Sequence, residues 1–131
     1  MHATVASVMR QAPVTITPGE TLATAQVLME REGIRQLPVI DQGVLVGMLS
    51  DRDLHAHTGY LERTKVDAAM SYDPATVGPT ATAQQAARLL MEREINALPV
   101  VDEGRLVGIV ARSDLLRLLV QLLDQPSTTG A

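Results

Sequence analysis

Apolar positions in the first half of the chain alternate between helical and extended patterns. Residues 22–32 carry apolar side chains with the i, i+3, i+4 spacing of an amphipathic helix. Residues 37–40 and 44–49 are almost continuously apolar, which is typical of strands buried on both faces. The segment 41–43 between them, Asp-Gln-Gly, predicts a tight turn in which the glycine takes a positive φ. A strand hairpin is therefore expected after the helix.

Three shorter patterns complete this unit. Residues 5–9 hold apolar side chains with helical spacing and predict one helical turn. Residues 14–17 predict a short strand that ends at Pro18, and residues 51–57 predict a second helix. The expected order of elements is strand, helix, strand, strand, helix.

The same pattern occurs a second time. When residues 5–54 are aligned with residues 66–115, 19 of the 50 positions are identical and no gap is needed. Two copies are too few for a solenoid, and about 55 residues make a marginal core. We therefore expect a pseudo-symmetric pair with an α+β fold of α/β type, with one repeat at 1–60 and the other at 61–123. The remaining residues, 124–131, are expected to form a disordered tail.

Helix ends are marked differently in the two copies. Thr21 is a predicted N-cap, and Thr82 with Gln85 has the spacing of a capping box. Gly33 is predicted to end the first of these helices. Because Glu94 stands at the corresponding position of the second copy, its helix is expected to end in another way.

Composition excludes several classes of function. Only two of the 131 residues are aromatic, both tyrosines, so the core must be aliphatic. A net charge of −4 gives no basic footprint for nucleic acid, and the absence of cysteine excludes thiol chemistry and disulfides. No signal peptide or membrane span is visible, so a cytoplasmic protein without a membrane partner is expected.

Several short motifs recur in the same order in both copies. In the first copy they are Pro18, Thr21, Ile34, 37–41 (LPVID), Gly43, 45–47 (LVG) and 50–54 (SDRDL). In the second they are Pro79, Thr82, Ile95, 98–102 (LPVVD), Gly104, 106–108 (LVG) and 112–115 (RSDL). This arrangement resembles a tandem pair of CBS domains, the cystathionine-beta-synthase-type repeat, which packs as one Bateman module of two β-α-β-β-α repeats. The resemblance covers residues 5–123, which leaves nothing for an attached enzyme or channel and suggests a stand-alone pair.

The resemblance also implies a site for an adenine nucleotide. An aspartate in the motif would hold the ribose, while hydroxyl and basic side chains would face the phosphates. By position, the implied nucleotide-binding residues are Thr17, Arg35, Ser50, Arg52, Asp53, Asn96, Arg112, Ser113 and Asp114. The implied adenine pocket consists of Ile16, Ile34, Pro38, Val77, Ile95 and Pro99. The residues by themselves favour simpler roles, since Ser50 and Asp53 suit a helix cap and the apolar set suits the core.

The second copy departs from the motif at two positions. Ala111 replaces the hydroxyl of Ser50, and Gly78 replaces the hydroxyl of Thr17. In the family, the first-strand hydroxyl comes from the opposite repeat, so neither expected cleft has a complete set. The sequence does not rank the two clefts.

The expected function is that of a non-enzymatic sensor of AMP, ADP or ATP, with S-adenosylmethionine or NAD as other possible ligands. The resemblance implies a homodimer, and an unidentified protein would respond to the ligand-bound state. The last helix is apolar on more than one side, through Leu115, Leu116, Leu118, Leu119, Leu122 and Leu123. The alternative is a ligand-free dimerisation adaptor. No nucleophile–base pair is visible, and His2, His55 and His57 are expected at the solvated surface rather than at a metal.

Overall fold

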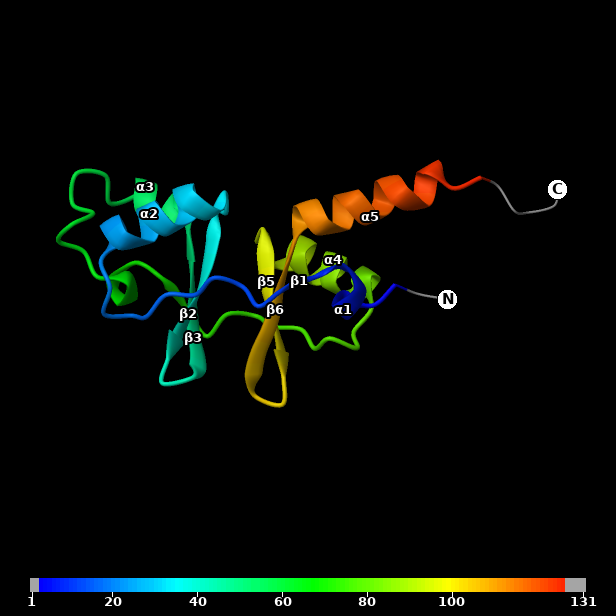
Figure 1. Ribbon diagram of the computed structural model, residues 1–131, viewed down its shortest axis with the longest axis horizontal. Helices are drawn as coiled ribbons and strands as arrows, with labels where there is room; N and C mark the ends of the chain where they lie inside the picture. Colours follow the sequence, from blue (N-terminus) through cyan, green and yellow to red (C-terminus); the bar gives the residue numbers. More distant parts are fainter. Residues whose placement is uncertain (1–2, 127–131) are drawn as a thin grey trace.

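The computed structural model describes residues 3–126 and shows two similar halves side by side, each with a strand hairpin and two helices (Figure 1). The first half contains α2 (Leu22–Glu32), β2 (Gln36–Asp41), β3 (Val44–Ser50) and α3 (Asp51–His55). The second contains α4 (Ala83–Arg93), β5 (Ala97–Asp102), β6 (Arg105–Ala111) and α5 (Arg112–Asp124). Both sheets are antiparallel, so the α+β fold is confirmed. Within the described residues, no helix is both long and apolar enough to cross a bilayer.

Both hairpins have two-residue turns in which the two central residues take positive φ. The angles are 50° at Gln42 and 81° at Gly43, and 50° at Glu103 and 79° at Gly104. Positive φ at both positions gives the turn the twist that matches the flanking strands. The predicted hairpins are confirmed, although Asp41 belongs to the strand rather than to the turn.

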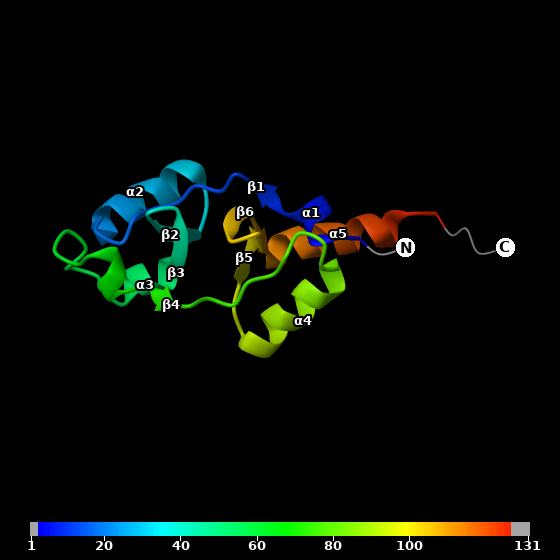
Figure 2. The same ribbon diagram turned by 90° about the horizontal axis from the view of Figure 1, so that it is seen from below.

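The opening segment of each repeat crosses over to the sheet of the other. After α1 (Val5–Val8), β1 (Arg10–Gln11) pairs with β6, so that Arg10 lies opposite Ile109. After the 3₁₀ turn η1 (Val66–Ala68), β4 (Ser71–Tyr72) pairs with β3. The sheets therefore have the orders β1-β6-β5 and β2-β3-β4. Figures 1 and 2 show α1 beside α4 and α5 rather than beside the first hairpin.

The hydrophobic cores follow this crossover. Val5 is fully buried in the second core, with Leu98 and Val110, whereas Val66 and Met70 belong to the first core. A smaller cluster of Met48, Ala97 and Ile109 lies between the two hairpins. The cores are aliphatic, as the composition predicts, and each is completed by residues from the other repeat.

Two glycines allow the crossing segments to approach the hairpins. A β-carbon on Gly47 would lie 2.6 Å from the Met70 sulfur and 2.8 Å from the Ser71 carbonyl oxygen. A β-carbon on Gly108 would lie 2.5 Å from the Met9 sulfur. The glycines of the two LVG motifs are therefore required by close packing.

The predicted strand at residues 14–17 is reduced to one bridge, so the strand prediction is wrong. Only Ile16 pairs, in parallel, with Val39, through an N–H bonded to the Pro38 carbonyl at 3.1 Å. Pro18 has no N–H, so it cannot donate to a ladder beyond this bridge. Val77 forms the same single bridge with Val100.

The helix ends are more alike than expected. Thr21 caps α2, and Thr82 with Gln85 forms the predicted capping box. Gly33 ends α2 in the left-handed conformation, and Glu94 ends α4 at φ 55° and ψ 42° in the same way, so the expected difference is wrong. The same closing hydrogen bond follows in both helices. The Ile34 N–H donates to the Met29 carbonyl, and the Ile95 N–H donates to the Leu90 carbonyl.

The last predicted elements differ slightly in length. Helix α3 ends at His55 instead of residue 57, and α5 extends through Asp124, a residue expected in the tail. Of the rest of the predicted tail, residues 125 and 126 are exposed and belong to no helix or strand, and residues 127–131 lie outside the described part of the chain.

Candidate functional site

A cleft of about 850 Å³ opens between the two repeats, where α3 and α5 begin. Its volume is in the range typical of small-molecule sites, about 300–1,000 Å³. The lining residues are Arg10, Ala12, Pro13, Val14, Glu32, Gly33, Ile34, Arg35, Gln36, Asp51, Arg52, His55, Asn96, Ala97, Ile109, Ala111, Arg112, Ser113 and Asp114. Both repeats and the crossing segment at residues 10–14 therefore contribute to one site.

Hydrogen bonds hold the two loops that precede the hairpins against the helix starts. The Asp51 N–H donates to the Arg35 carbonyl, and the Arg112 N–H donates to the Asn96 carbonyl, both at 3.0 Å. These bonds fix the backbone of Arg35 and Asn96 beside the first residues of α3 and α5. The side chains of both loop residues are exposed and line the cleft.

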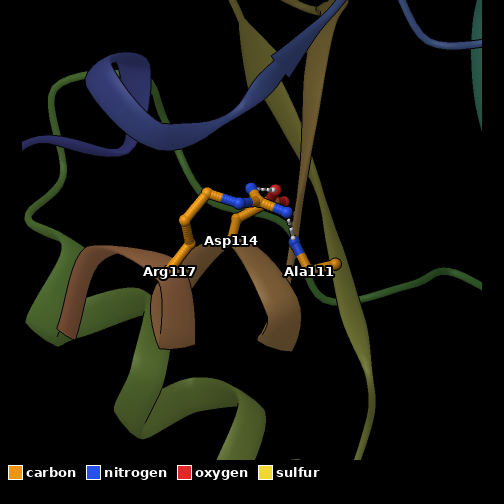
Figure 3. Close-up of polar contacts among 3 residues, drawn as sticks. All are labelled: Ala111, Asp114 and Arg117. Atoms are coloured by element: carbon orange, nitrogen blue, oxygen red, sulfur yellow. Dashed lines mark hydrogen bonds and ion pairs between the residues drawn. The ribbon is translucent and has the colours of Figure 1, made fainter. Parts of the chain in front are cut away.

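Asp114 is the buried acidic group of this cleft, with only 7% of its surface exposed. One of its carboxylate oxygens accepts the Ala111 N–H at 2.8 Å, and the other accepts Arg117 Nη1 at 3.2 Å (Figure 3). Because both oxygens are bonded within the protein, the carboxylate is held in one orientation. The bond to the Ala111 N–H is one half of a capping box, and because Ala111 has no hydroxyl, no side chain of the N-cap residue accepts the Asp114 N–H in return.

Asp53, the equivalent aspartate of the first repeat, is used differently. Its Oδ2 accepts the Ser50 N–H at 2.7 Å and the Ser50 hydroxyl at 3.0 Å, while its own N–H donates to Ser50 Oγ at 3.3 Å. This is the complete capping box that the simpler interpretation predicts. Neither Ser50 nor Asp53 lines the cleft.

Four arginines from four different segments line the cleft: Arg10 of β1, Arg35 of the loop before β2, Arg52 of α3 and Arg112 of α5. Across residues 3–126, none of them forms a salt bridge. Two of the three acidic residues of the lining are paired outside this set, since Glu32 contacts Arg31 and Asp114 contacts Arg117. The cleft therefore presents an excess of positive charge that no carboxylate pairs with.

A sequence model of the CBS domain matches residues 5–57 and 66–121, which is most of the chain. The chain belongs to the CBS domain family. It is 38% identical over 104 residues to the CBS domain-containing protein YhcV of Bacillus subtilis, covering 77% of this chain and 74% of that protein. It is 34% identical to the CBS domain-containing protein DDB_G0289609 of Dictyostelium discoideum, covering 95% and 96%.

Solved structures of CBS pairs share this fold. A putative acetoin utilization protein (AcuB) from Vibrio cholerae superposes with a TM-score of 0.84 at 32% identity, covering 95% of both chains. CBSX2, a CBS-pair protein from Arabidopsis thaliana, has been solved in complex with AMP. That complex superposes with a TM-score of 0.82 at 32% identity, covering 92% of this chain and 98% of that one.

The structure brings together about half of the residues that the CBS resemblance implies. Those lining the cleft are Ile34, Arg35, Arg52, Asn96, Arg112, Ser113 and Asp114. Those outside its lining are Thr17, Ser50, Asp53, Ile16, Pro38, Val77, Ile95 and Pro99. Pro38 and Pro99 are fully buried, and Val77 and Ile95 pack against the second core. The side chains of these four residues are therefore used for packing rather than for this cleft.

Sequence reasoning missed the contribution of the crossing segment. Arg10, Pro13 and Val14 line the cleft because β1 pairs with β6 of the other repeat, a pairing that no local pattern indicates. His55 was expected at the solvated surface; it is exposed and also lines the cleft. Within residues 3–126 no cluster of three or more histidine and acidic side chains suits a metal ion.

Proposed function

We propose that this CBS pair is a non-enzymatic regulatory module that binds an adenine nucleotide in the cleft of Asp114. The observation that carries the proposal is a buried, fixed carboxylate beside arginines without salt bridges, in a cleft lined by both repeats. A carboxylate suits the ribose hydroxyls, and guanidinium groups suit phosphate oxygens. The AMP complex of CBSX2, a protein 32% identical to this chain, supports the same class of ligand.

Each part of the cleft would take one part of the nucleotide. Asp114 would accept hydrogen bonds from the ribose, and Val14, Ile34 and Ile109 offer apolar contacts for the purine. Ser113 and the arginines would face the phosphates.

The regulatory step would be a change in how the two repeats pack. Since the cleft is lined by both repeats, a ligand there contacts both at once. A shift requires a difference in affinity between two arrangements, because equal affinity for both changes no population. A protein partner would respond to the arrangement that the ligand favours.

The direct test is thermal unfolding of the purified chain with AMP, ADP and ATP, and with S-adenosylmethionine and NAD. A ligand at 100 times its Kd is expected to stabilise the folded state by about 2.7 kcal/mol. An increase in Tm with at least one adenine nucleotide supports the proposal. An unchanged Tm with all five compounds would contradict it and leave the ligand-free adaptor.

We propose further that the chain forms a homodimer through α5. Five apolar residues of this helix are exposed: Leu116 (61%), Leu119 (49%), Val120 (55%), Leu122 (53%) and Leu123 (74%). Figure 1 shows α5 projecting past the rest of its own repeat, so intrachain packing leaves its outer half uncovered. The exposed apolar side chains are compatible with both the nucleotide sensor and the adaptor, and only the adaptor requires the dimer. Sedimentation equilibrium at micromolar concentration tests the proposed homodimer. A monomer at every concentration would contradict it.

A further inference from the structure

We infer that the cleft selects adenosine ligands with two or more phosphates, and that Arg10 is a specificity-determining residue for this choice. The inference rests on the proposed nucleotide binding at the same site. It names the ligand class within that proposal, a nucleoside di- or triphosphate in preference to a monophosphate or a cationic adenosine derivative.

The first argument is the number of cations without a carboxylate partner. Four arginines line the cleft without a salt bridge in the described chain, although the whole chain has a net charge of −4. Arg112 uses its Nε on the Ile95 carbonyl at 3.1 Å, and the other three guanidinium groups can each bind bidentately. Together the four groups offer more donors than the oxygens of one phosphate can accept in good geometry. A longer phosphate chain can contact arginines that come from separate segments.

The second argument is where the acidic residues are. Asp114 is already bonded to Arg117, and Glu32 contacts Arg31, so neither neutralises the four arginines. Asp51 is the third acidic residue of the lining. A ligand with a sulfonium or ammonium group, such as S-adenosylmethionine, would add positive charge to this surplus.

The third argument is an asymmetry between the repeats. The internal alignment pairs Arg10 with Ser71 and Ala12 with Asp73. At these two positions the pseudo-symmetric surface has one positive charge fewer and one negative charge more. Over the whole lining, Glu32 aligns with Arg93 and Gly33 with Glu94, so the counterpart also has four arginines but four acidic residues instead of three. Arg10 is held in place because β1 pairs with β6 and packs closely over Gly108. The crossing segment at residues 10–14 therefore supplies a cation, Arg10, for which the equivalent segment at residues 71–75 has no counterpart.

The experiment is calorimetric titration of adenosine, AMP, ADP, ATP and S-adenosylmethionine into the full chain at two salt concentrations. Affinity is expected to increase along the phosphate series, with ATP at least about tenfold tighter than AMP, since a charged hydrogen bond contributes about 1.5–3 kcal/mol. The advantage of ATP should shrink at higher salt.

The variant Arg10→Ser introduces the residue of the second repeat. It should lower ATP affinity about tenfold and leave adenosine affinity unchanged. Arg88→Ser, on α4 and outside the cleft, is the matched control and should change neither. If Arg10→Ser does not fold, Arg52→Ser on α3 is expected to show the same selective loss.

The outcomes separate this inference from the proposed function. Equal affinity for adenosine, AMP and ATP, or tighter binding of S-adenosylmethionine than of ATP, overturns the inference while nucleotide binding stands. Failure of every adenosine compound to bind overturns both. Inorganic triphosphate is titrated as a last ligand, and binding as tight as that of ATP would overturn both the inference and the proposed adenosine recognition.

Discussion

At the scale of single residues, equivalent aspartates have different surroundings. Both accept the N–H of the residue that precedes their helix, but Asp53 also accepts the Ser50 hydroxyl, whereas Asp114 is buried in the cleft and bonded to Arg117. The replacement of serine by Ala111 removes the hydroxyl half of the capping box at the start of α5, while Asp114 still accepts the Ala111 N–H. From the sequence, this replacement removes one expected hydroxyl contact of the second repeat and leaves the two clefts unranked. In the structure, it accompanies the aspartate that faces the cleft.

This difference predicts different effects of the same substitution. Asp114→Ala should weaken nucleotide binding by about tenfold to a hundredfold, since a charge-assisted hydrogen bond contributes about 1.5–3 kcal/mol. Asp53→Ala should lower the free energy of unfolding by about 1 kcal/mol, through the lost cap, with little change in binding. Calorimetric titration and urea denaturation of both variants measure the two effects. Parent-like affinity of Asp114→Ala would contradict the assignment of the ribose contact.

At the scale of elements, local chemistry predicts most of what is observed. The caps at Thr21 and Thr82 and the two-residue turns form as their sequences indicate, because each depends on hydrogen bonds within a few residues. Glu94 shows the limit of this reasoning. Its helix ends in the left-handed conformation although glycine is absent, since the chain must turn there to enter β5.

The site is less predictable than the elements for a related reason. Arg35, Asn96 and Asp114 lie in motifs that recur along the sequence, so the resemblance finds them. Arg10 reaches the cleft only through the pairing of β1 with β6, which depends on residues about 100 positions away. No local pattern distinguishes Arg10 from an ordinary exposed arginine.

Helix α5 carries a prediction about assembly. Leu119→Glu or Leu123→Glu places a charge on its exposed apolar face and should shift the chain to monomer, since each buried leucine contributes about 1.5–3 kcal/mol to association. Val44→Glu is the matched control, because Val44 is 57% exposed at the hairpin turn of the first repeat. Sedimentation velocity compares the three variants. Dimers that persist in both leucine variants would show that α5 is not the interface.

At the scale of the whole molecule, the crossover makes two similar repeats into one folded unit. Val5 is buried in the second core, and Val66 and Met70 are buried in the first, so neither repeat has a complete core from its own residues. The cleft depends on the same arrangement, because Arg10 and residues 12–14 line it beside the second hairpin.

The glycines at which the crossing segments approach the hairpins predict that substitution there lowers the stability of the fold. Gly108→Ala would place a β-carbon 2.9 Å from the Arg10 carbonyl oxygen, so the free energy of unfolding should decrease by about 1–3 kcal/mol. Gly19→Ala is the control, since a β-carbon on Gly19 would have no neighbouring atom within 4 Å and its φ is not positive. Urea denaturation compares the two. Equal stability of both variants would contradict the close approach of β1 to β6.

The exchange of opening segments also bears on what happens when the chain is divided. Cut in the connector at residues 58–64, the chain would give fragments 1–60 and 61–131, each lacking the apolar segment that completes its core. Each fragment alone should aggregate or remain largely unfolded, whereas an equimolar mixture should reassemble and recover the far-ultraviolet circular dichroism of the intact chain. Independent folding of either fragment would mean that a repeat does not need the opening segment of the other repeat in order to fold. If they do reassemble, pairing fragments from variant chains would give a way to alter one half of the molecule at a time.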